Sequence, residues 1–404
     1  MSDTEVIIRL AAKGDGVTAS GRHVPLSAPG DTVRADGTLV RGPHHAEPPC
    51  RHFGKCGGCQ LQQCDDAALA EYVSGRVLHA ARAQGLAPEV FAPVHLSPPR
   101  SRRRATLHAV NGGARALVGF SEGGSHRLVD IKECHVLVPE LFALVAPLRA
   151  WLSPRKDKYA AQIDLTLADQ GVDCAIRNIK VDGLDQIEGL LDFCRDNGLA
   201  RLTLDQGYGP ESFWEPEPVT VTLGNVPVPL PPGAFLQATR DGEQALVAAV
   251  RDWQGDAGQV ADLFSGLGTF AFAMASAFSR EGRAQVTACE ASRHAVLACK
   301  AAARTHGASV EAVHRDLFRS PLQPAELARF GMVVVDPPRA GARSQIEQLA
   351  ASSVPRIAYI SCNPSSWSRD GGLLRENGYR LAELRPVGQF RWSTHVELAS
   401  LFIK

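Results

Sequence analysis

Three residues in the last third of the chain carry side chains that could act on a substrate, and each lies at or near the end of an apolar run. Cys362 follows RIAYIS, Asp336 follows VVV, and Glu397 lies among apolar neighbours in THVELASLFIK. A thiolate can attack an electron-poor carbon, and a carboxylate can accept a proton. A cysteine at a strand end is often only a small buried hydrophobe, and a buried acid is costly unless it is paired or functional. The rigid turn Asn363-Pro364 beside Cys362 favours a nucleophile.

A glycine-rich turn, Asp262 to Thr269, precedes these residues in the sequence. It follows an apolar run and leads into an Ala-rich segment of helical composition. Gly266 and Gly268 would let the backbone approach a ligand closely, although the third glycine of the nicotinamide fingerprint is absent. Glu290 ends the next apolar run, 28 residues after Asp262, where an acid can accept hydrogen bonds from ribose hydroxyls. Together these features predict a cofactor that carries a nucleoside.

Cysteines are concentrated near residue 50, with the spacing Cys50-x5-Cys56-x2-Cys59. The ten cysteines of the chain are not expected to form disulfides in a cytoplasmic protein, because the thiol pool keeps them reduced. Three close thiolates need a fourth ligand to hold a metal, and Cys64 and Cys134 are the candidates. Zinc and an iron-sulfur cluster both tolerate such spacings. The pattern therefore predicts a metal centre without choosing the metal.

A run of arginines, Arg100 and Arg102 to Arg104, lies in a strand-like stretch that continues as ATLHAV. Such a run is usually a solvated face. In a chain with 43 basic and 43 acidic residues, however, this concentration of guanidinium groups is the best candidate for contact with phosphates.

A parallel sheet is expected to position the reactive residues. QVADLF, QVTACE, SVEAVHRD, GMVVVDPP and RIAYISC read as short buried strands, separated by segments long enough for crossovers. Ligands bind at the carboxyl ends of such strands, so Asp336 and Cys362 share one rim if their strands are adjacent. YRLAELRPVG and THVELASLFIK lie too close together for a crossover helix, which predicts an antiparallel hairpin at one edge.

The rest of the chain divides into two further regions. Residues 1–45 alternate short apolar runs with Gly and Asp turns, which predicts a small domain that is a β-barrel or a β-meander. Residues 46–233 predict a mixed α/β central domain that carries the cysteines and the arginine run. A proline-rich stretch, Pro227 to Pro232, marks the boundary before the third domain, residues 234–404.

The composition is that of an ordinary globular protein. With 404 residues, 45% hydrophobic and 21% charged, the chain can bury a core in two or three domains, which excludes global disorder. A formal net charge of zero does not indicate a polyanionic partner, so any surface for nucleic acid must be a local patch. Acids near the start of the sequence, and the lack of a run of about 18 apolar residues, predict a cytoplasmic protein without a membrane span. We also expect a monomer.

The motifs together resemble the bacterial RNA uridine-5 methyltransferases that use S-adenosylmethionine and carry an iron-sulfur cluster, most of all the members that act on 23S rRNA. The resemblance covers nearly the whole chain. It implies a C-terminal Rossmann-like methyltransferase domain and a TRAM-like N-terminal β domain, here shorter than usual. Its most specific parts are CRHFGKCGGCQLQ, GFSEGGSHRLVDIKECHVL, FLQATRDGEQALV, DLFSGLGTF, DPPRAGA, YISCNPSSWSRD and HVELASLFIK.

The resemblance also implies roles for residues at matching positions. Cys362 becomes the nucleophile and Glu397 the proton acceptor. Thr269 stands where the family usually has an Asn that contacts the cofactor. A four-iron, four-sulfur (4Fe-4S) cluster would be held by Cys50, Cys56, Cys59 and Cys134, which leaves Cys64 as a bystander. The residues expected to bind S-adenosylmethionine are Gln237, Phe264, Gly266, Gly268, Thr269, Glu290, Asp316 and Asp336, and those expected to bind RNA are Arg102, Arg103 and Arg104.

The implied reaction transfers a methyl group from S-adenosylmethionine to carbon 5 of a uridine through a covalent adduct between cysteine and uracil. Ribosomal RNA is favoured over transfer RNA, because members that act on transfer RNA typically lack the cysteine cluster. The alternatives are a uridine-5 methyltransferase of transfer RNA and a metal-stabilised RNA-binding protein without catalysis. A cytosine-5 methyltransferase would carry a second cysteine directly after a proline in the motif that corresponds to DPPR, where this chain has none. An enzyme that methylates nitrogen would need no cysteine on the rim.

Overall fold

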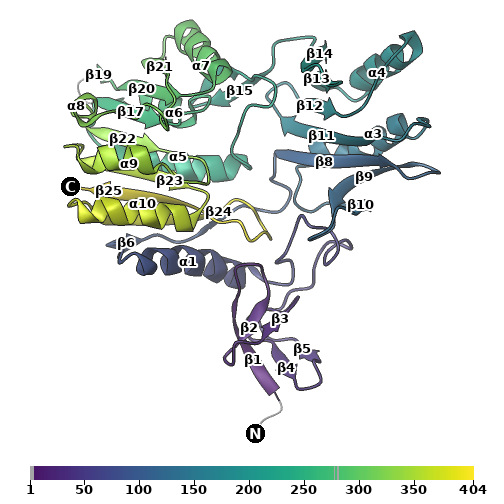
Figure 1. The fold of residues 1–404 in the computed structure, drawn as a ribbon, viewed down its shortest axis with the longest axis horizontal. Coiled ribbons are helices and arrows are strands. Elements are labelled where there is room, and N and C mark those ends of the chain that lie inside the picture. Colours follow the sequence, from purple (N-terminus) through teal and green to yellow (C-terminus); the bar gives the residue numbers. More distant parts are fainter. Residues whose placement is uncertain (1–3, 277, 280–281) are drawn as a thin grey trace.

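The computed structural model describes residues 4–276, 278–279 and 282–404, and three large sheets divide it into three parts (Figure 1). In Figure 1 a nine-stranded sheet with its helices forms the left lobe and a seven-stranded sheet forms the right lobe. The N-terminal strands lie below the junction of the two lobes. Within the described residues, no helix is both long and apolar enough to cross a membrane.

The N-terminal sheet is open. Its strand order is β3-β2-β1-β4-β5, and β3 and β5 do not pair with each other among the described residues. The closed, barrel-like domain expected for residues 1–45 is therefore not confirmed, and residues 1–3 of that range lie outside the described residues. The strands are β1 (Thr4–Leu10), β2 (Gly16–Thr18), β3 (His23–Val24), β4 (Thr32–Arg34) and β5 (Leu39–Val40).

The central sheet has the order β10-β9-β8-β11-β12-β13-β14, and its strands are antiparallel except for the pair β12 and β13. Three helices pack into one core with this sheet, so they cover one face. The other face looks toward the left lobe. The elements are β8 (Arg104–Asn111), β9 (Ala116–Ser121), β10 (Leu128–Asp130), α2 (Pro139–Ala143), α3 (Val145–Leu152), β11 (Ala160–Leu167), β12 (Val172–Arg177), α4 (Leu184–Asp196), β13 (Leu199–Asp205) and β14 (Pro210–Trp214).

The third sheet contains the five expected parallel strands, in the order β21-β20-β17-β22-β23. β25 pairs antiparallel with both β23 and β24, which confirms the expected hairpin. Residues alternate between two cores along a strand: Val333 and Val335 of β22 belong to one, and Met332 and Val334 to the other. The strands are β17 (Gln259–Leu263), β20 (Gln285–Glu290), β21 (Val310–His314), β22 (Met332–Val335), β23 (Arg356–Ser361), β24 (Arg380–Gly388) and β25 (Glu397–Ile403).

Helices cover both faces of this sheet. α8 (Pro324–Leu327), α9 (Arg343–Ala350) and α10 (Pro364–Glu376) contribute to one core, and α5 (Arg240–Gln254) and α6 (Thr269–Ala275) to the other. α7 (Arg293–His306) packs with the hairpin of β15 (Thr220–Leu223) and β16 (Val226–Pro229). A two-residue pair of strands, β18 (Phe278–Ser279) and β19 (Gly282–Arg283), follows α6.

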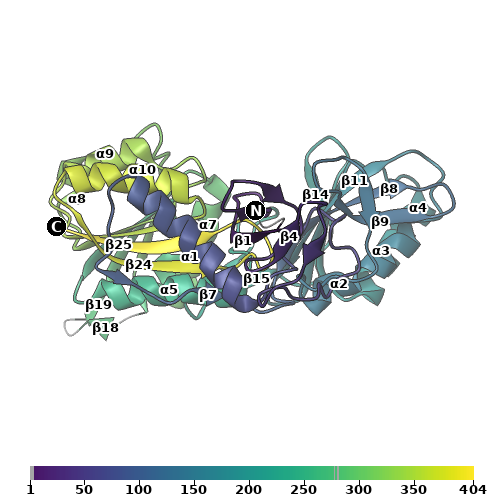
Figure 2. The ribbon, with the colours of Figure 1, turned by 90° about the horizontal axis from the view of Figure 1, so that it is seen from below.

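The segment before the arginine run corrects the expected domain division. α1 (Asp66–Ala83) packs in the same core as α10 and β24, and Figure 2 shows it lying across β24 and β25. β6 (Val90–Phe91) and β7 (His95–Leu96) both pair in parallel with β24. These elements lie within residues 46–233, the range expected for the central domain, but β6 and β7 complete the third sheet and cover the edge at β24.

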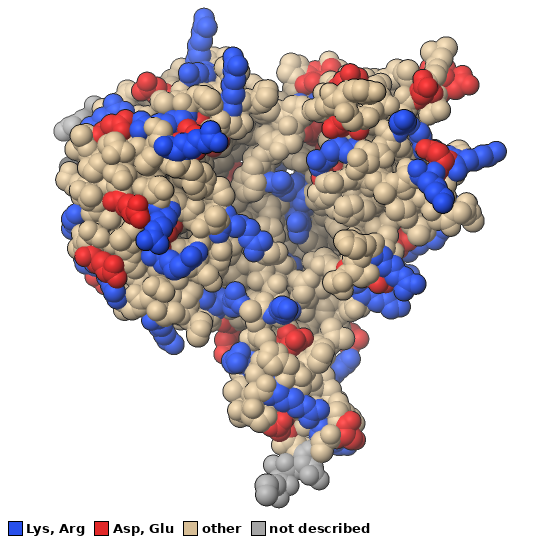
Figure 3. All heavy atoms as spheres, viewed as in Figure 1, with Lys and Arg blue, Asp and Glu red and all other residues tan. Residues whose placement is uncertain are grey.

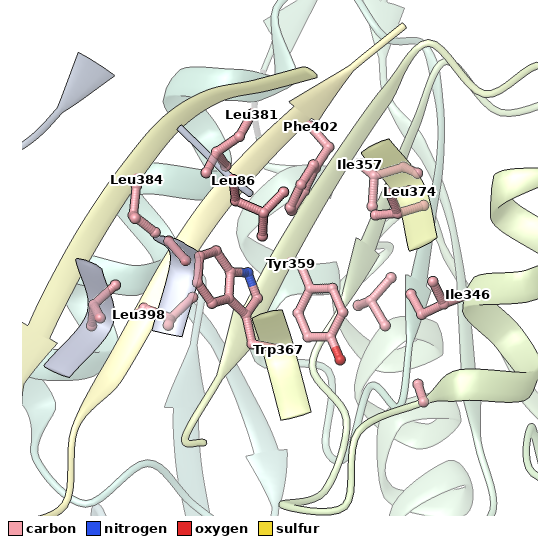
Figure 4. Close-up of a cluster of buried hydrophobic side chains, with 14 of the residues drawn as sticks. Leu86, Ile346, Ile357, Tyr359, Trp367, Leu374, Leu381, Leu384, Leu398 and Phe402 are labelled. Carbon is pink, nitrogen blue, oxygen red and sulfur yellow. The ribbon is translucent and has the colours of Figure 1, made fainter. Parts of the chain in front are cut away.

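A large hydrophobic core holds the two elements on either side of Cys362 (Figure 4). Trp367 of α10 donates a hydrogen bond from Nε1 to Ser400 Oγ at 2.8 Å, and Tyr359 of β23 donates to Asp370 Oδ2 at 2.6 Å. These bonds tie β23, α10 and β25 together, so the turn that carries Cys362 has a rigid base.

Candidate active site at the carboxyl end of the sheet

The sheet brings Cys362, Asp336 and Glu397 to one edge. β22 and β23 are neighbours, so Asp336 and Cys362 leave the sheet side by side, as expected. In the antiparallel pair of β23 and β25, Ser361 lies opposite Leu398, so Cys362, directly after β23, and Glu397, the first residue of β25, lie at the same end of the pair. The sequence therefore places a thiol and two carboxyl groups on one rim.

The turn after β23 is fastened to the turn after β22. Asn363 caps α10, and its side-chain Nδ2 donates to the backbone oxygen of Arg339 at 2.9 Å. Ser366 Oγ donates to the same oxygen at 3.0 Å. These two bonds fix the Asp336-Pro337-Pro338-Arg339 segment against the nucleophile candidate.

Burial makes all three side chains harder to ionise. It raises the pKa of Asp336 to about 7 and, together with Asp336, the pKa of Glu397 to about 8. Burial, with the nearby carboxylates of Glu397 and Asp336, raises the pKa of Cys362 to about 11, while Arg339 acts to lower it. Carboxyl groups with raised pKa values are suited to proton transfer near neutral pH.

Two buried glutamines connect the two carboxyl groups. Gln237 donates from Nε2 to Asp336 Oδ2 at 3.4 Å, and Gln389 donates from Nε2 to Gln237 Oε1 at 2.8 Å and to Glu397 Oε2. Gln237 was expected at the site, but Gln389 was not. The sequence offers little signal for it, because a single polar residue after the end of a strand reads as a loop residue.

A cleft of about 760 Å³ opens between the two lobes and includes Cys362 and Glu397 of this rim. Its lining comes from the free face of the central sheet, with Thr106, Asp164 and Arg177, and from the rim, with Cys362 and Glu397. Figure 3 shows this hollow between the lobes, with Lys and Arg side chains visible inside it. The cleft has one polar wall, where Arg177 is paired with Asp164, and one wall that carries the reactive groups.

The expected cofactor residues surround the turn after β17. Phe264 and Gly266 both have positive φ values, of 63° and 54°, and a Cβ added at Gly266 would meet no atom within 4 Å. Glu290 receives hydrogen bonds from the backbone nitrogens of Gly266 at 3.0 Å and Ser292 at 2.6 Å. The open space beside Gly266 therefore lies next to a fixed carboxylate.

The remaining cofactor candidates lie around the same turn. Gly268 has φ 95°, and a Cβ there would lie 2.9 Å from Phe272, so a larger residue does not fit. Thr269 begins α6 directly after it. Asp316 accepts a hydrogen bond from the backbone nitrogen of Phe318 at 3.0 Å, and the Phe318 ring packs against Phe264 with 5.3 Å between centroids.

The arginine run is divided between the cleft and the interior. Arg102 and Arg104 line the cleft, where their guanidinium groups lie over the rings of Phe390 and Phe235. Arg103 corrects our expectation of a phosphate contact, because its side chain is only 2% exposed and pairs with Glu243 of α5 at 2.5 Å. Arg103 lies directly before β8, and its ion pair with α5 joins the two lobes.

Replacing Arg103 with Met should lower the free energy of unfolding by about 3–5 kcal/mol, because it leaves the Glu243 carboxylate buried without its partner. The double variant Arg103→Met/Glu243→Leu should recover most of this loss, since no unpaired charge remains. Urea denaturation measures both. As a control, Arg195→Met breaks a pair whose side chains are 63% and 61% exposed, and should cost less than about 1 kcal/mol. Equal losses for Arg103→Met and Arg195→Met would contradict the internal role of Arg103.

Four of the ten cysteines surround one small hollow of about 40 Å³: Cys50, Cys56, Cys59 and Cys134. Burial raises the pKa of Cys50, Cys56 and Cys59, and each of these thiols also interacts electrostatically with Cys134. Cys64 does not line the hollow and is buried elsewhere. Among the described residues, no group of three or more His, Cys, Asp or Glu side chains has a geometry that could hold a single metal ion.

The doubly wound sheet, with a glycine-rich turn after its first strand and a thiol-carboxylate rim beside a cleft, has a methyltransferase fold. The tRNA (uracil-54, C5)-methyltransferase of Pyrococcus abyssi, solved with S-adenosyl-L-homocysteine, superposes with a TM-score of 0.74 at 23% identity, covering 99% of both chains. A model of the tRNA (Uracil-5-)-methyltransferase family matches residues 232–404.

Sequence relatives extend over the whole chain. An uncharacterized RNA methyltransferase of Zymomonas mobilis is 50% identical over 402 residues, covering 98% of this chain and 99% of the relative. The 23S rRNA (uracil(1939)-C(5))-methyltransferase RlmD of Pectobacterium atrosepticum is 30% identical over 373 residues, covering 90% and 82%. The chain belongs to the RNA uracil-5-methyltransferase family, and it is an RNA methyltransferase.

Proposed function

We propose that this protein transfers a methyl group from S-adenosylmethionine to carbon 5 of a uridine in RNA, through a covalent adduct between Cys362 and uracil. The observation that carries the proposal is that the Cys362 thiol and the buried Glu397 carboxyl group line one cleft, at the same end of the paired strands β23 and β25. Uracil methylation at carbon 5 needs a nucleophile and a base on one side of the substrate, and this rim holds both.

The chemistry explains why both groups are needed. Carbon 5 of uracil is a poor nucleophile, so the Cys362 thiolate first adds to carbon 6, and the electron pair of the double bond becomes an enolate. Carbon 5 would then bond to the methyl group, whose bond to the sulfonium sulfur breaks and leaves its electron pair on that sulfur. Glu397, in its carboxylate form, removes the proton from carbon 5, the double bond forms again, and the thiolate leaves. The thiol must first lose its proton to water in the cleft, and Arg339 is the positive charge that favours this loss.

The turn after β17 and the rim provide a matching site for the methyl donor. When bound, S-adenosylmethionine supplies a methyl group on a positively charged sulfur. We propose that Glu290 accepts hydrogen bonds from its ribose, that Phe264, Thr269 and Asp316 border its nucleoside, and that Gln237 and Asp336 lie nearer the rim. Gly266 and Gly268 give the backbone the close approach that the ligand requires.

Replacing Glu290 with Gln should weaken the binding of S-adenosylmethionine about tenfold or more, since hydrogen bonds to a charged group contribute roughly 1.5–3 kcal/mol. Isothermal titration calorimetry measures the change. Glu311→Gln, which alters an exposed acid on β21, is the matched control and should leave the affinity unchanged. If Glu290→Gln binds as tightly as the control, this carboxylate is not in the pocket.

We propose that Arg102 and Arg104 contact the phosphates of the RNA as it enters the cleft. Phosphate contacts position the RNA without reading its sequence, so the choice of uridine must come from elsewhere. We favour 23S rRNA because the relative RlmD acts on it, with transfer RNA as the alternative. Since one chain supplies every proposed group, we propose a monomer, working in the cytoplasm.

The four cysteines around the small hollow fit a metal centre chemically. Ligating sulfurs must be thiolates, and burial opposes this, so a positively charged group in the hollow would offset the cost. A 4Fe-4S cluster is larger than one ion, so its ligands stand farther apart than those of a single metal. We propose such a cluster on Cys50, Cys56, Cys59 and Cys134, with a structural role.

Protein purified without oxygen should be brown and contain iron, and Cys134→Ser should lose the iron because it removes one of four ligands. Cys64→Ser is the matched control and should keep the iron, since Cys64 lies outside the hollow. Elemental analysis of the purified protein gives the metal content. Zinc in place of iron would refute the cluster, and iron that survives Cys134→Ser would exclude this ligand set.

Methylation of purified RNAs tests the proposed function. The protein is incubated with labelled S-adenosylmethionine and with ribosomal or transfer RNA from a strain that lacks its gene, and the nucleosides are then separated. We expect labelled 5-methyluridine in ribosomal RNA. Label in transfer RNA alone would show that the substrate is transfer RNA and not ribosomal RNA. Label on a nitrogen or on cytosine would overturn the proposed reaction.

A further inference from the structure

Gln389 lies beside the proposed base, Glu397, and has no role in the reaction steps proposed above. Its side chain is almost completely buried. Its Nε2 donates to Glu397 Oε2 and to Gln237 Oε1, the latter at 2.8 Å, and its Oε1 accepts from the backbone nitrogen of Thr239 at 3.4 Å. All the polar atoms of this amide therefore face fixed partners.

This arrangement distinguishes the two oxygens of Glu397. Oε2 receives the hydrogen bond from Gln389, whereas Oε1 has no protein hydrogen-bond partner among the described residues. Glu397 lines the cleft, so Oε1 is the oxygen that can take a proton from a bound base. An amide N–H donor favours the charged form of a carboxylate, and the bond from Gln389 acts to lower the pKa of Glu397.

The loop that carries Gln389, residues 389–396, is fastened to the cysteine segment. The backbone oxygen of Trp392 accepts hydrogen bonds from the backbone nitrogens of Gln60 at 2.8 Å and Leu61 at 2.9 Å. These are the two residues directly after Cys59. Arg391 adds bonds to Asp66 Oδ1 and to the backbone oxygen of Ser97, so the loop is held at several points.

The chain also fits closely around Gln389 itself. A Cβ added at Gly242, in the first turn of α5, would lie 2.6 Å from the Cβ of Gln389. The guanidinium group of Arg102 lies over the next residue, Phe390, at 5.4 Å from the ring centroid. The position of the amide is thus set by α5, the arginine run and the cysteine segment together.

We propose that Gln389 is a positioning residue for the proton-transfer step, which holds Oε2 of Glu397 so that Oε1 faces carbon 5 of the substrate. The loop anchored next to Cys59 keeps the amide in place, which gives the cysteine segment a part in catalysis. This inference rests on the proposed function, because it assigns a step of that reaction.

Gln389→Leu removes the donor at similar volume and should slow the release of hydrogen from carbon 5 by roughly 10- to 100-fold, the range for a lost hydrogen bond to a charged group. Release of tritium from RNA labelled at carbon 5 of uridine measures this step. Methyl transfer in a single turnover should change by no more than about threefold. A covalent enzyme-RNA species should therefore accumulate on natural RNA.

The pH dependence gives a second readout. Without the amide donor, the pKa of Glu397 should rise further, so tritium release should reach its plateau at a higher pH than in the wild type. The groups that face Glu397 are Asp336 and Cys362, with Arg339 and His395 lining the same cleft, and the substitution leaves them all in place.

Gln345→Leu is the matched control, because Gln345 is an equally buried glutamine that makes two hydrogen bonds to Leu322, away from the rim. This variant should lower stability but should not slow the release of hydrogen from carbon 5 relative to methyl transfer. Gln389→Met provides a more flexible side chain if the Leu variant does not fold. Arg391→Met, which loosens the loop without touching the rim, should give a smaller change of the same kind.

Equal rates of tritium release in Gln389→Leu and wild type would overturn the inference, as would equal slowing of methyl transfer and tritium release. Failure of the proposed function would look different. In that case the wild-type protein itself would not form a covalent complex with RNA that contains 5-fluorouridine.

Discussion

Replacing Cys362 with Ala is expected to abolish methyl transfer, with a loss of about four to six orders of magnitude, as for removal of other covalent nucleophiles. Without the sulfur no adduct forms at carbon 6, so carbon 5 never becomes nucleophilic. Covalent trapping on RNA that contains 5-fluorouridine should disappear at the same time. Both losses are measured on one preparation, by transfer of labelled methyl groups and by a denaturing gel.

The variant should still bind both substrates, because the Cys362 side chain does not stabilise the turn in which it lies. Asn363 and Ser366 make the bonds to the Arg339 segment, and neither is changed. Cys194→Ala removes a buried thiol of the central domain and is the matched control, with full activity expected. Substantial methyl transfer by Cys362→Ala would contradict the covalent mechanism and favour the alternative that the enzyme methylates nitrogen.

Replacing Glu397 with Gln should have a different effect, because this residue is assigned to a later step. Addition of Cys362 and transfer of the methyl group need no carboxylate at this position, so they should proceed. Removal of the proton from carbon 5 should slow by about 10²–10⁴-fold, the usual contribution of a general base. The methylated adduct should then accumulate on natural RNA as a slowly migrating band on a denaturing gel.

Wild-type turnover by Glu397→Gln, with no trapped species, would leave this residue as a structural carboxylate. Loss of adduct formation altogether would also contradict its assignment, since it would place the residue before the methyl transfer. The Cys362→Ala/Glu397→Gln double variant is the control for the band and should show none.

The pH dependence of proton removal should follow Glu397. Because burial and Asp336 raise the pKa of Glu397 to about 8, most of this side chain carries a proton at lower pH and cannot act as a base. The rate of hydrogen release from carbon 5 should rise with pH through this range and level off above it. In Glu397→Gln the rise should be absent.

The parallel sheet and its reactive rim could be predicted from the sequence, because each depends on local patterns. Buried apolar runs ending in Asp336 and Cys362 place both residues at strand ends, and the rule for ligand binding in such sheets places them on one rim. The pairing of β24 and β25 followed from the short connection between them. The family resemblance supplied the role of Glu397.

Other features depend on contacts between distant segments and leave no local pattern. Arg103 has the same sequence context as Arg102 and Arg104, and its burial depends on distant partners, the Gln237 backbone oxygen and the Glu243 carboxylate, 134 and 140 residues away. β6 and β7 are two residues each, too short to show the alternation of apolar and polar residues that is typical of a strand. They form because their backbones pair with β24. The pattern of short strands at the N-terminus fits a closed barrel and an open sheet equally well, so the sequence could not predict that this sheet is open.

One measurement tests the central claim directly: identification of the residue and the nucleotide in the trapped complex. The protein is incubated with S-adenosylmethionine and RNA that contains 5-fluorouridine, where fluorine in place of hydrogen on carbon 5 blocks the last step. The complex is then digested with protease and nuclease, and the modified peptide is sequenced by mass spectrometry. We predict a peptide in which Cys362 carries a fluorinated uridine with one added methyl group. An unmodified Cys362 together with methylated RNA, or a nucleotide attached to another cysteine, would contradict the account.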